Sequence, residues 1–186
     1  TTADNNTAVG KSALVANTTG TQNVAIGPQA SLANTTGQDN ISIGLLAGRG
    51  NTTANYSVAI GTLALGSTSN NGGSNVGIGY YALSANTGAN NVAVGRQALE
   101  ANTTGDSAVA VGKDSMKTNT TGRFNSALGY ESLALNTTGA NNVALGKGAL
   151  YSNTTASNNT AVGFQALVAN TTGANNVAIG SLTLDA

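Results

Sequence analysis

A glycine that ends a short apolar segment recurs eleven times along the chain, almost always at an interval of 17 residues. The copies are Gly10, Gly27, Gly44, Gly61, Gly79, Gly95, Gly112, Gly129, Gly146, Gly163 and Gly180, so the interval changes only around Gly79. A repeat this short leaves no room for a conventional globular core, whereas stacked copies can bury one another's apolar side chains. The sequence therefore predicts a solenoid, whose function has to be read from columns of equivalent residues.

The composition narrows the classes of function. The 186 residues include 25 Gly, and only 4% are aromatic and 8% charged, which suits a globular core poorly. Disorder would explain the polarity but not apolar residues that recur in register. Cys and His are absent, which removes disulfides, thiolate and imidazole metal ligands, and the commonest general base. We expect no enzyme, no metal and no cofactor.

The charge balance argues against two kinds of partner. Seven Lys and Arg balance seven Asp and Glu, so no overall field attracts nucleic acid or an anionic membrane surface. No apolar run is long enough to span a bilayer, and the first residues do not form a targeting peptide. We expect no nucleic-acid partner and no membrane insertion by this segment.

Alternating apolar residues predict one short β-strand in each coil. Bulky, mostly β-branched residues occupy the positions three and one residues before the glycine, as Val24 and Ile26 do before Gly27. This alternation places both columns on one face of a strand, and we expect that face to be buried. The fold class is therefore all-β, a parallel β-solenoid of eleven 17-residue coils.

A third bulky column lies four residues after the glycine and is also expected in the core. Ser31 and Gly48 are its exceptions, and we expect Leu32 and Leu45–Leu46 to supply the displaced apolar volume. The regular members are Leu14, Leu65, Leu83, Leu99, Met116, Leu133, Leu150, Leu167 and Leu184.

Between the two strand columns lies a column of small residues only. A solvent-facing column has no reason to exclude Lys, Glu and Gln in every coil, so another backbone should lie close to this face. That backbone could belong to the same coil or to a partner chain, and we favour the partner. The predicted homotrimer interface therefore comprises Ala25, Ala59, Ala93, Ala110, Ala127, Ala144, Ala161 and Ala178.

Asn-Thr-Thr-Gly segments, such as 136–139, predict the return turn, in which Asn and Thr bond local backbone and Gly takes a positive φ. A further Asn column, which includes Asn91 and Asn142, predicts an amide ladder along the axis.

Turn chemistry also explains a set of Asn-X-Thr sequons better than glycosylation does. These sequons begin at Asn17, Asn34, Asn51, Asn102, Asn119, Asn136, Asn153 and Asn170.

The segments Asn23–Gly27 and Asn176–Gly180, both Asn-Val-Ala-Ile-Gly, resemble the head repeat of trimeric autotransporter adhesins, which reads roughly Asn-Ser-Val-Ala-Ile-Gly. The resemblance covers all eleven copies and implies a left-handed parallel β-roll, three chains around one axis, and adhesion outside the cell. Repeats such as 154–163 are also similar to shafts of phage-type tail fibres and other trimeric surface fibres. The coil is longer than that family's usual one, by the residues of Ala-Asn-Thr-Thr-Gly.

Columns free to vary are the best candidates for ligand binding. In the column after the glycine, aromatic and cationic residues mix from Tyr80 to Phe164 at about 4.8 Å per coil. This arrangement suits cation–π contacts, stacking on sugars or binding of anionic groups. Solubilising charge, with aromatics that cover the flank of the rod, is the simpler explanation. The candidate ligand-binding residues are Tyr80, Tyr81, Arg96, Lys113, Tyr130, Lys147 and Phe164.

Together these features predict a structural and adhesive fibre segment, with residues 1–186 as a single repeat array within a longer fibre. We expect it outside a cell or on a virion, with itself as one partner and host-cell glycans, matrix or another cell surface as the others. The alternative is a purely structural shaft of a phage-type tail fibre or surface filament. An ice-binding solenoid is a more distant alternative, because the adjacent Thr residues of each turn point to opposite sides.

Overall fold

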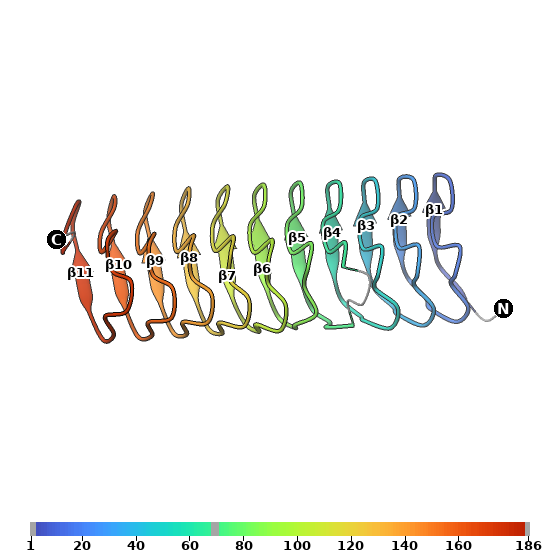
Figure 1. Cartoon of the computed structure of the whole chain (residues 1–186). Coiled ribbons are helices and arrows are strands. Elements are labelled where there is room, and N and C mark those ends of the chain that lie inside the picture. The colour runs from blue at the N-terminus through green and yellow to red at the C-terminus, as the bar shows by residue number, and fades with distance from the viewer. Residues whose placement is uncertain (1–2, 68–70, 185–186) are drawn as a thin grey trace.

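The computed structural model describes residues 3–67 and 71–184, and within them the chain is a single row of stacked coils with its two ends at opposite ends of the row (Figure 1). Each coil contributes one three-residue strand, and the strands form one parallel sheet in chain order. The strands are β1 (Thr7–Val9), β2 (Val24–Ile26), β3 (Ile41–Ile43), β4 (Val58–Ile60), β5 (Val76–Ile78), β6 (Val92–Val94), β7 (Val109–Val111), β8 (Ser126–Leu128), β9 (Val143–Leu145), β10 (Thr160–Val162) and β11 (Val177–Ile179). The predicted solenoid of 17-residue coils is confirmed.

The sheet register is unbroken where the repeat interval changes. Val58 pairs with Val76, 18 residues later, and Val76 pairs with Val92, 16 residues later, so each strand still faces its equivalent. The extra residue is therefore absorbed outside the strands. At about 4.8 Å per strand the eleven coils make a rod roughly 50 Å long.

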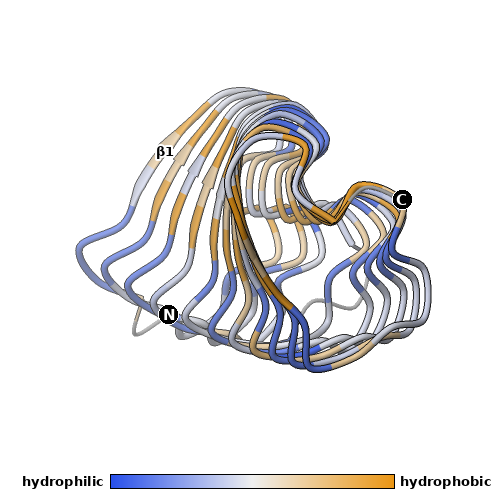
Figure 2. Cartoon of the chain, turned by 90° about the vertical axis from the view of Figure 1, so that its left-hand side faces the viewer, coloured by the Kyte–Doolittle hydropathy of each residue, from blue (hydrophilic) through white to orange (hydrophobic). Residues whose placement is uncertain are grey.

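The interior of the coil lies on the opposite side of the strand from the one that the sequence predicted. The two bulky columns do share a face, but that face points outward, and Val109, Leu128 and Ile179 are 41%, 52% and 71% exposed. Figure 2, which looks along the rod from its C-terminal end, shows equivalent residues of successive coils as continuous bands, with apolar bands on the strands. We call this outward surface of β1–β11 the strand face.

The small-residue column lies inside the chain's own coil, which corrects the trimer interface predicted above. At Gly77, the member of this column in β5, an added Cβ would lie 3.2 Å from the carbonyl oxygen of Ala82 and 3.3 Å from Leu65 Cγ. The close backbone therefore belongs to the same chain, which explains the restriction to small side chains. The eight alanines are already buried without a partner, at 0–2% exposure: Ala25, Ala59, Ala93, Ala110, Ala127, Ala144, Ala161 and Ala178.

The third bulky column fills the interior, as predicted, through the central coils. Leu83, Leu99, Met116, Leu133 and Leu150 are completely buried and belong to one apolar cluster that extends from Ala47 to Ala178. Each of these residues has a positive φ between 47° and 53°, which bulky residues rarely adopt. The left-handed conformation turns the chain inward at this position and so aims the side chain at the small-residue column.

The two exceptions in this column are not compensated as predicted. Leu45 is 45% exposed, and Leu32 and Leu46 are only partly buried. Instead, Ser31 donates a buried hydrogen bond of 2.8 Å from its hydroxyl to that of Ser42. A polar pair thus separates the main apolar cluster from a smaller one around Leu14, Ala25 and Ala30.

Glycine stands at two places in most coils, for different reasons. The glycines that end the strands have φ between 119° and 139°, and a Cβ on Gly129 would lie 2.6 Å from the carbonyl carbon of Gly146. The turn glycine Gly105 does not have the predicted positive φ. There a Cβ would lie 2.5 Å from both Asn102 Oδ1 and Gly122 O, so close stacking of the turns leaves little room for a side chain. Two coils nevertheless accommodate a methyl group here, at Ala54 and Ala156.

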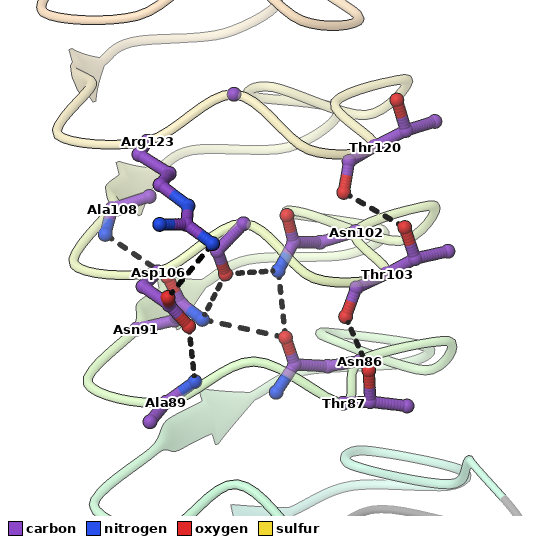
Figure 3. Close-up of polar contacts among 12 residues, drawn as sticks. Asn86, Thr87, Ala89, Asn91, Asn102, Thr103, Asp106, Ala108, Thr120 and Arg123 are labelled. Atoms are coloured by element: carbon purple, nitrogen blue, oxygen red, sulfur yellow. Dashed lines mark hydrogen bonds and ion pairs between the residues drawn. The ribbon is translucent and has the colours of Figure 1, made fainter.

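Two amide ladders connect the coils, and Figure 3 shows part of both. In the first, Asn91 Oδ1 accepts from the Ala108 amide of the next coil at 2.9 Å. In the second, Asn119 Nδ2 donates to Asn102 Oδ1 at 2.8 Å and to Gly122 O at 3.0 Å. The predicted amide ladder is confirmed, and the sequon asparagines other than Asn51 take part in the second one. Most of these asparagines are buried, which favours the turn interpretation over glycosylation. The exposed fraction is 0–4% for Asn34, Asn51, Asn102, Asn119, Asn136 and Asn153.

Candidate functional site

The variable side chains gather on the segment that follows each strand-ending glycine. In the coil of β8, Tyr130 and Glu131 point outward while Ser132 and Leu133 are buried. The Glu131 amide donates to Lys113 O of the preceding coil at 3.0 Å, which keeps equivalent side chains in straight columns. We call this surface the flank, defined by Tyr80, Tyr81, Arg96, Gln97, Glu100, Lys113, Asp114, Lys117, Thr118, Tyr130, Glu131, Ala134, Leu135, Lys147, Tyr151 and Phe164.

The predicted cation–π contacts are present along the flank. Arg96 lies over the Tyr80 ring, with 6.0 Å between the guanidinium carbon and the ring centroid. The ammonium groups of Lys113 and Lys147, from the preceding and following coils, lie 5.1 and 5.7 Å from the Tyr130 centroid. Lys147 is also 5.7 Å from the Phe164 centroid. The structure therefore brings the candidate residues other than Tyr81 together as one column, in which the cations are already partnered by rings of their own chain.

Two tyrosines of the flank hold their protons more tightly than a free tyrosine does. The pKa of Tyr81 is raised, first by the charge interaction with Tyr80, whose ring centroid is 4.4 Å away, and then by desolvation. The pKa of Tyr130 is raised mainly by its hydrogen bond with Glu131, against the opposing effect of Lys113. Both phenols are therefore neutral near pH 7 and present hydroxyl groups rather than anions.

Two lysines of the flank, Lys113 and Lys117, are also paired with carboxylates. Lys113 Nζ lies 3.3 Å from Asp114 Oδ2, and Lys117 Nζ lies 3.9 Å from Glu100 Oε2. Lys117 is equally far from Asp114 Oδ1, which is buried and has no hydrogen-bond partner, since 3.9 Å exceeds hydrogen-bonding distance. The flank is thus nearly balanced in charge and retains one unsatisfied acceptor beside Lys117.

An open hollow of about 290 Å³ lies on the flank across three consecutive coils. Two columns carry small residues at this point: Ala134 stands between Lys117 and Tyr151 in one column, and Gly148 follows Glu131 in the other. The hollow is lined by Asp114, Lys117, Thr118, Glu131, Ala134, Leu135 and Tyr151.

The predicted ligand-binding residues other than Tyr81 form an aromatic and cationic ridge of the flank beside the hollow, whereas the variable columns that line the hollow were not singled out. Of the predicted ligand-binding residues, none lines it. The available signal was a small residue between large ones in a variable column, together with Leu135 in a column that elsewhere holds only Ala, Gly, Ser or Thr within the described coils. Such a signal becomes readable only when neighbouring columns are known to lie on the same side of the coil.

No family model matches the chain, and no curated protein or solved structure matches it significantly. Within residues 3–67 and 71–184, no group of three or more acidic side chains is placed to hold a metal ion. The same part of the chain contains no helix with the length and apolarity needed to cross a membrane.

Proposed function

We propose that this chain is a segment of an extracellular fibre, a homotrimer of parallel β-rolls on the surface of a cell or virion that attaches its bearer to another surface. The single observation that carries the proposal is the strand face, an apolar strip that runs the length of the rod and remains uncovered in one chain. We assign the segment no catalytic role.

The composition of the strand face supports a protein partner. Its 22 outward positions, two in each strand, hold no charged residue, and all but Thr7, Ser126 and Thr160 are apolar. Soluble monomers rarely expose a contiguous apolar surface of this extent, and such surfaces usually mark contacts between proteins. The flank, by contrast, carries most of the charge and suits exposure to water.

The spacing of the strand face favours a second copy of the same chain as that partner. Its side chains repeat once per strand, at about 4.8 Å, and a parallel copy has the same repeat over the same length. Bulky side chains of one rod can then enter the gaps of the other in every coil. A cyclic assembly would pack the column of Val109 against the column of Val111 of its neighbour. The number of three chains, and the left-handed coil, rest on the resemblance to adhesin head repeats.

Oligomeric state tests the proposal directly. Sedimentation equilibrium of the chain should give three times the 18.1 kDa of one copy, and the double variant Val109→Lys, Leu128→Lys should sediment as a folded monomer. Thr104→Lys, which adds a charge to an exposed turn, is the matched control and should remain a trimer. A wild-type chain that is a stable monomer at micromolar concentration would refute the assembly.

Attachment distinguishes the adhesive fibre from its rival, a purely structural shaft. The isolated trimer should bind cells or extracellular matrix saturably, whereas a shaft would show only non-saturable background. The open hollow on the flank is the observation that favours the adhesive fibre over the shaft. Absence of thermal hysteresis in the same preparation would dispose of the ice-binding alternative.

A further inference from the structure

We propose that the hollow on the flank is a binding subsite for a neutral sugar ring, presented by a glycan chain on the surface to which the fibre attaches. The inference rests on the attachment function proposed above and names its ligand class. It uses residues that are distinct from the aromatic and cationic ridge beside it.

The hollow combines the two kinds of surface that a sugar ring requires. Tyr151 and the 38% exposed Leu135 provide apolar contact for the C–H groups of a pyranose. Asp114, Glu131 and Lys117 provide charged hydrogen-bonding groups within the same lining. Carboxylates accept from sugar hydroxyls and an ammonium donates to them, and such charge-assisted bonds are stronger than neutral ones.

The local pairing of charges favours an uncharged ligand over an anionic one. Lys117 already lies 3.9 Å from both Glu100 and Asp114, and Glu131 adds another carboxylate to the lining. A sulfate, phosphate or carboxylate in the hollow would therefore meet more negative than positive groups. A hydroxyl-rich neutral ring can donate to these carboxylates without this repulsion.

The neighbouring ridge is a poorer sugar platform than the sequence suggested. Tyr130 has a lysine over its ring from the coil on each side, and Lys147 also lies over Phe164. A sugar could stack on these rings only by displacing the lysines. No cation lies over Tyr151 in the described structure, and its side chain borders the hollow.

The fold supplies variants that fill the hollow without a foreign residue type in the column. Ala134 occupies a column that holds Glu100, Lys117 and Tyr151 in nearby coils, so Ala134→Tyr should fold and occupy the subsite. Ser84→Tyr makes the same change in the same column two coils before the hollow begins and is the matched control. Glu131→Gln keeps the shape of the lining and removes one carboxylate.

The experiment titrates the isotope-labelled full chain with neutral trisaccharides of glucose, galactose and N-acetylglucosamine, and with sulfated and sialylated counterparts, followed by NMR. We expect at least one neutral trisaccharide to shift the amide signals of Thr118, Leu135 and Tyr151 saturably. Affinity should fall about tenfold or more in Ala134→Tyr and severalfold in Glu131→Gln, and should be unchanged in Ser84→Tyr.

Three outcomes would overturn the inference: no saturable neutral ligand at millimolar concentration, a preference for the anionic counterparts, or equal binding by wild type and Ala134→Tyr. The cell-attachment assay separates this failure from failure of the proposed function. If Ala134→Tyr attaches to cells as well as the wild type does, the fibre is adhesive through another surface. If the wild type does not attach at all, the adhesive function itself is wrong.

Discussion

The coils of β5–β9 and those of β2–β4 have the same backbone pairing but different interiors. In the first region the interior column is an unbroken series of buried Leu and Met, and the second amide ladder continues through each coil from Asn86 to Asn153. In the second region Ser31 and Gly48 replace two leucines, and Asn34 Oδ1 has no hydrogen-bond partner. The strands nevertheless pair residue for residue in both.

This difference shows that the register of the sheet does not depend on the contents of each coil. Neighbouring coils impose the register, because each strand is hydrogen-bonded on both sides and its ending glycine has to fit against the next. Stability, in contrast, should vary along the rod with what each coil buries. We expect β2–β4 to open at a lower free-energy cost than β5–β9.

Three residues in the coils of β2–β4 depart from the repeat pattern together: Ser31, Ser42 and Gly48. An added Cβ on Gly48 would collide with the Ser42 hydroxyl, so that hydroxyl occupies space that a side chain at Gly48 would otherwise fill. Ser31 then satisfies the hydroxyl through the 2.8 Å bond. The defect is a small, internally bonded polar cluster in place of two leucines, and it buries less apolar surface.

The largest effect should come from a charge placed in the interior of the regular region. Ala144→Arg puts a guanidinium among the buried leucines and alanines of the main apolar cluster, where it has no partner, and the cost is several kcal/mol. The chain should unfold locally or aggregate, as measured by circular dichroism and size-exclusion chromatography. If the alanine column instead formed a surface between chains, Ala144→Arg would give a folded monomer, contrary to the interior position.

Removal of one core leucine should have the next largest effect. Leu133→Ala empties a completely buried position between Met116 and Leu150 and should lower the free energy of unfolding by about 3–5 kcal/mol. Hydrogen exchange should show the loss in β7–β9 and little change in β2–β4. A loss spread evenly over all strands would contradict regional stability.

The amide ladder allows a direct comparison of the two regions. Asn119 donates to Asn102 and Gly122 and accepts from Asn136 at 2.7 Å, whereas Asn34 makes the two donor bonds but accepts none. Asn119→Ala should therefore cost about 1–3 kcal/mol, and Asn34→Ala less, since fewer buried partners lose a bond. Urea denaturation of the two variants checks the order, and equal losses would mean that ladder continuity adds nothing.

The sequence alone predicted the repeat, the strands, their register and the amide ladder, because each follows from spacing along one chain. It did not show which face of the strand is inside, since alternation defines two faces without assigning either. The deciding facts are the narrow interior of a 17-residue coil and the left-handed conformation that turns residues such as Leu99 inward. The hollow at Ala134 was missed for a related reason, because it needs the relative positions of three columns.

The smallest effect should come from the polar cluster in β2–β4, and its size depends on how many partners are removed. Ser31→Ala leaves the buried Ser42 hydroxyl without its bond and should cost about 1–2 kcal/mol, whereas the double variant Ser31→Ala, Ser42→Ala removes both hydroxyls and should be nearly neutral. A double-mutant cycle by urea denaturation measures the coupling. Additive losses would mean that the two hydroxyls act independently, and the defect would then be a simple loss of apolar contact.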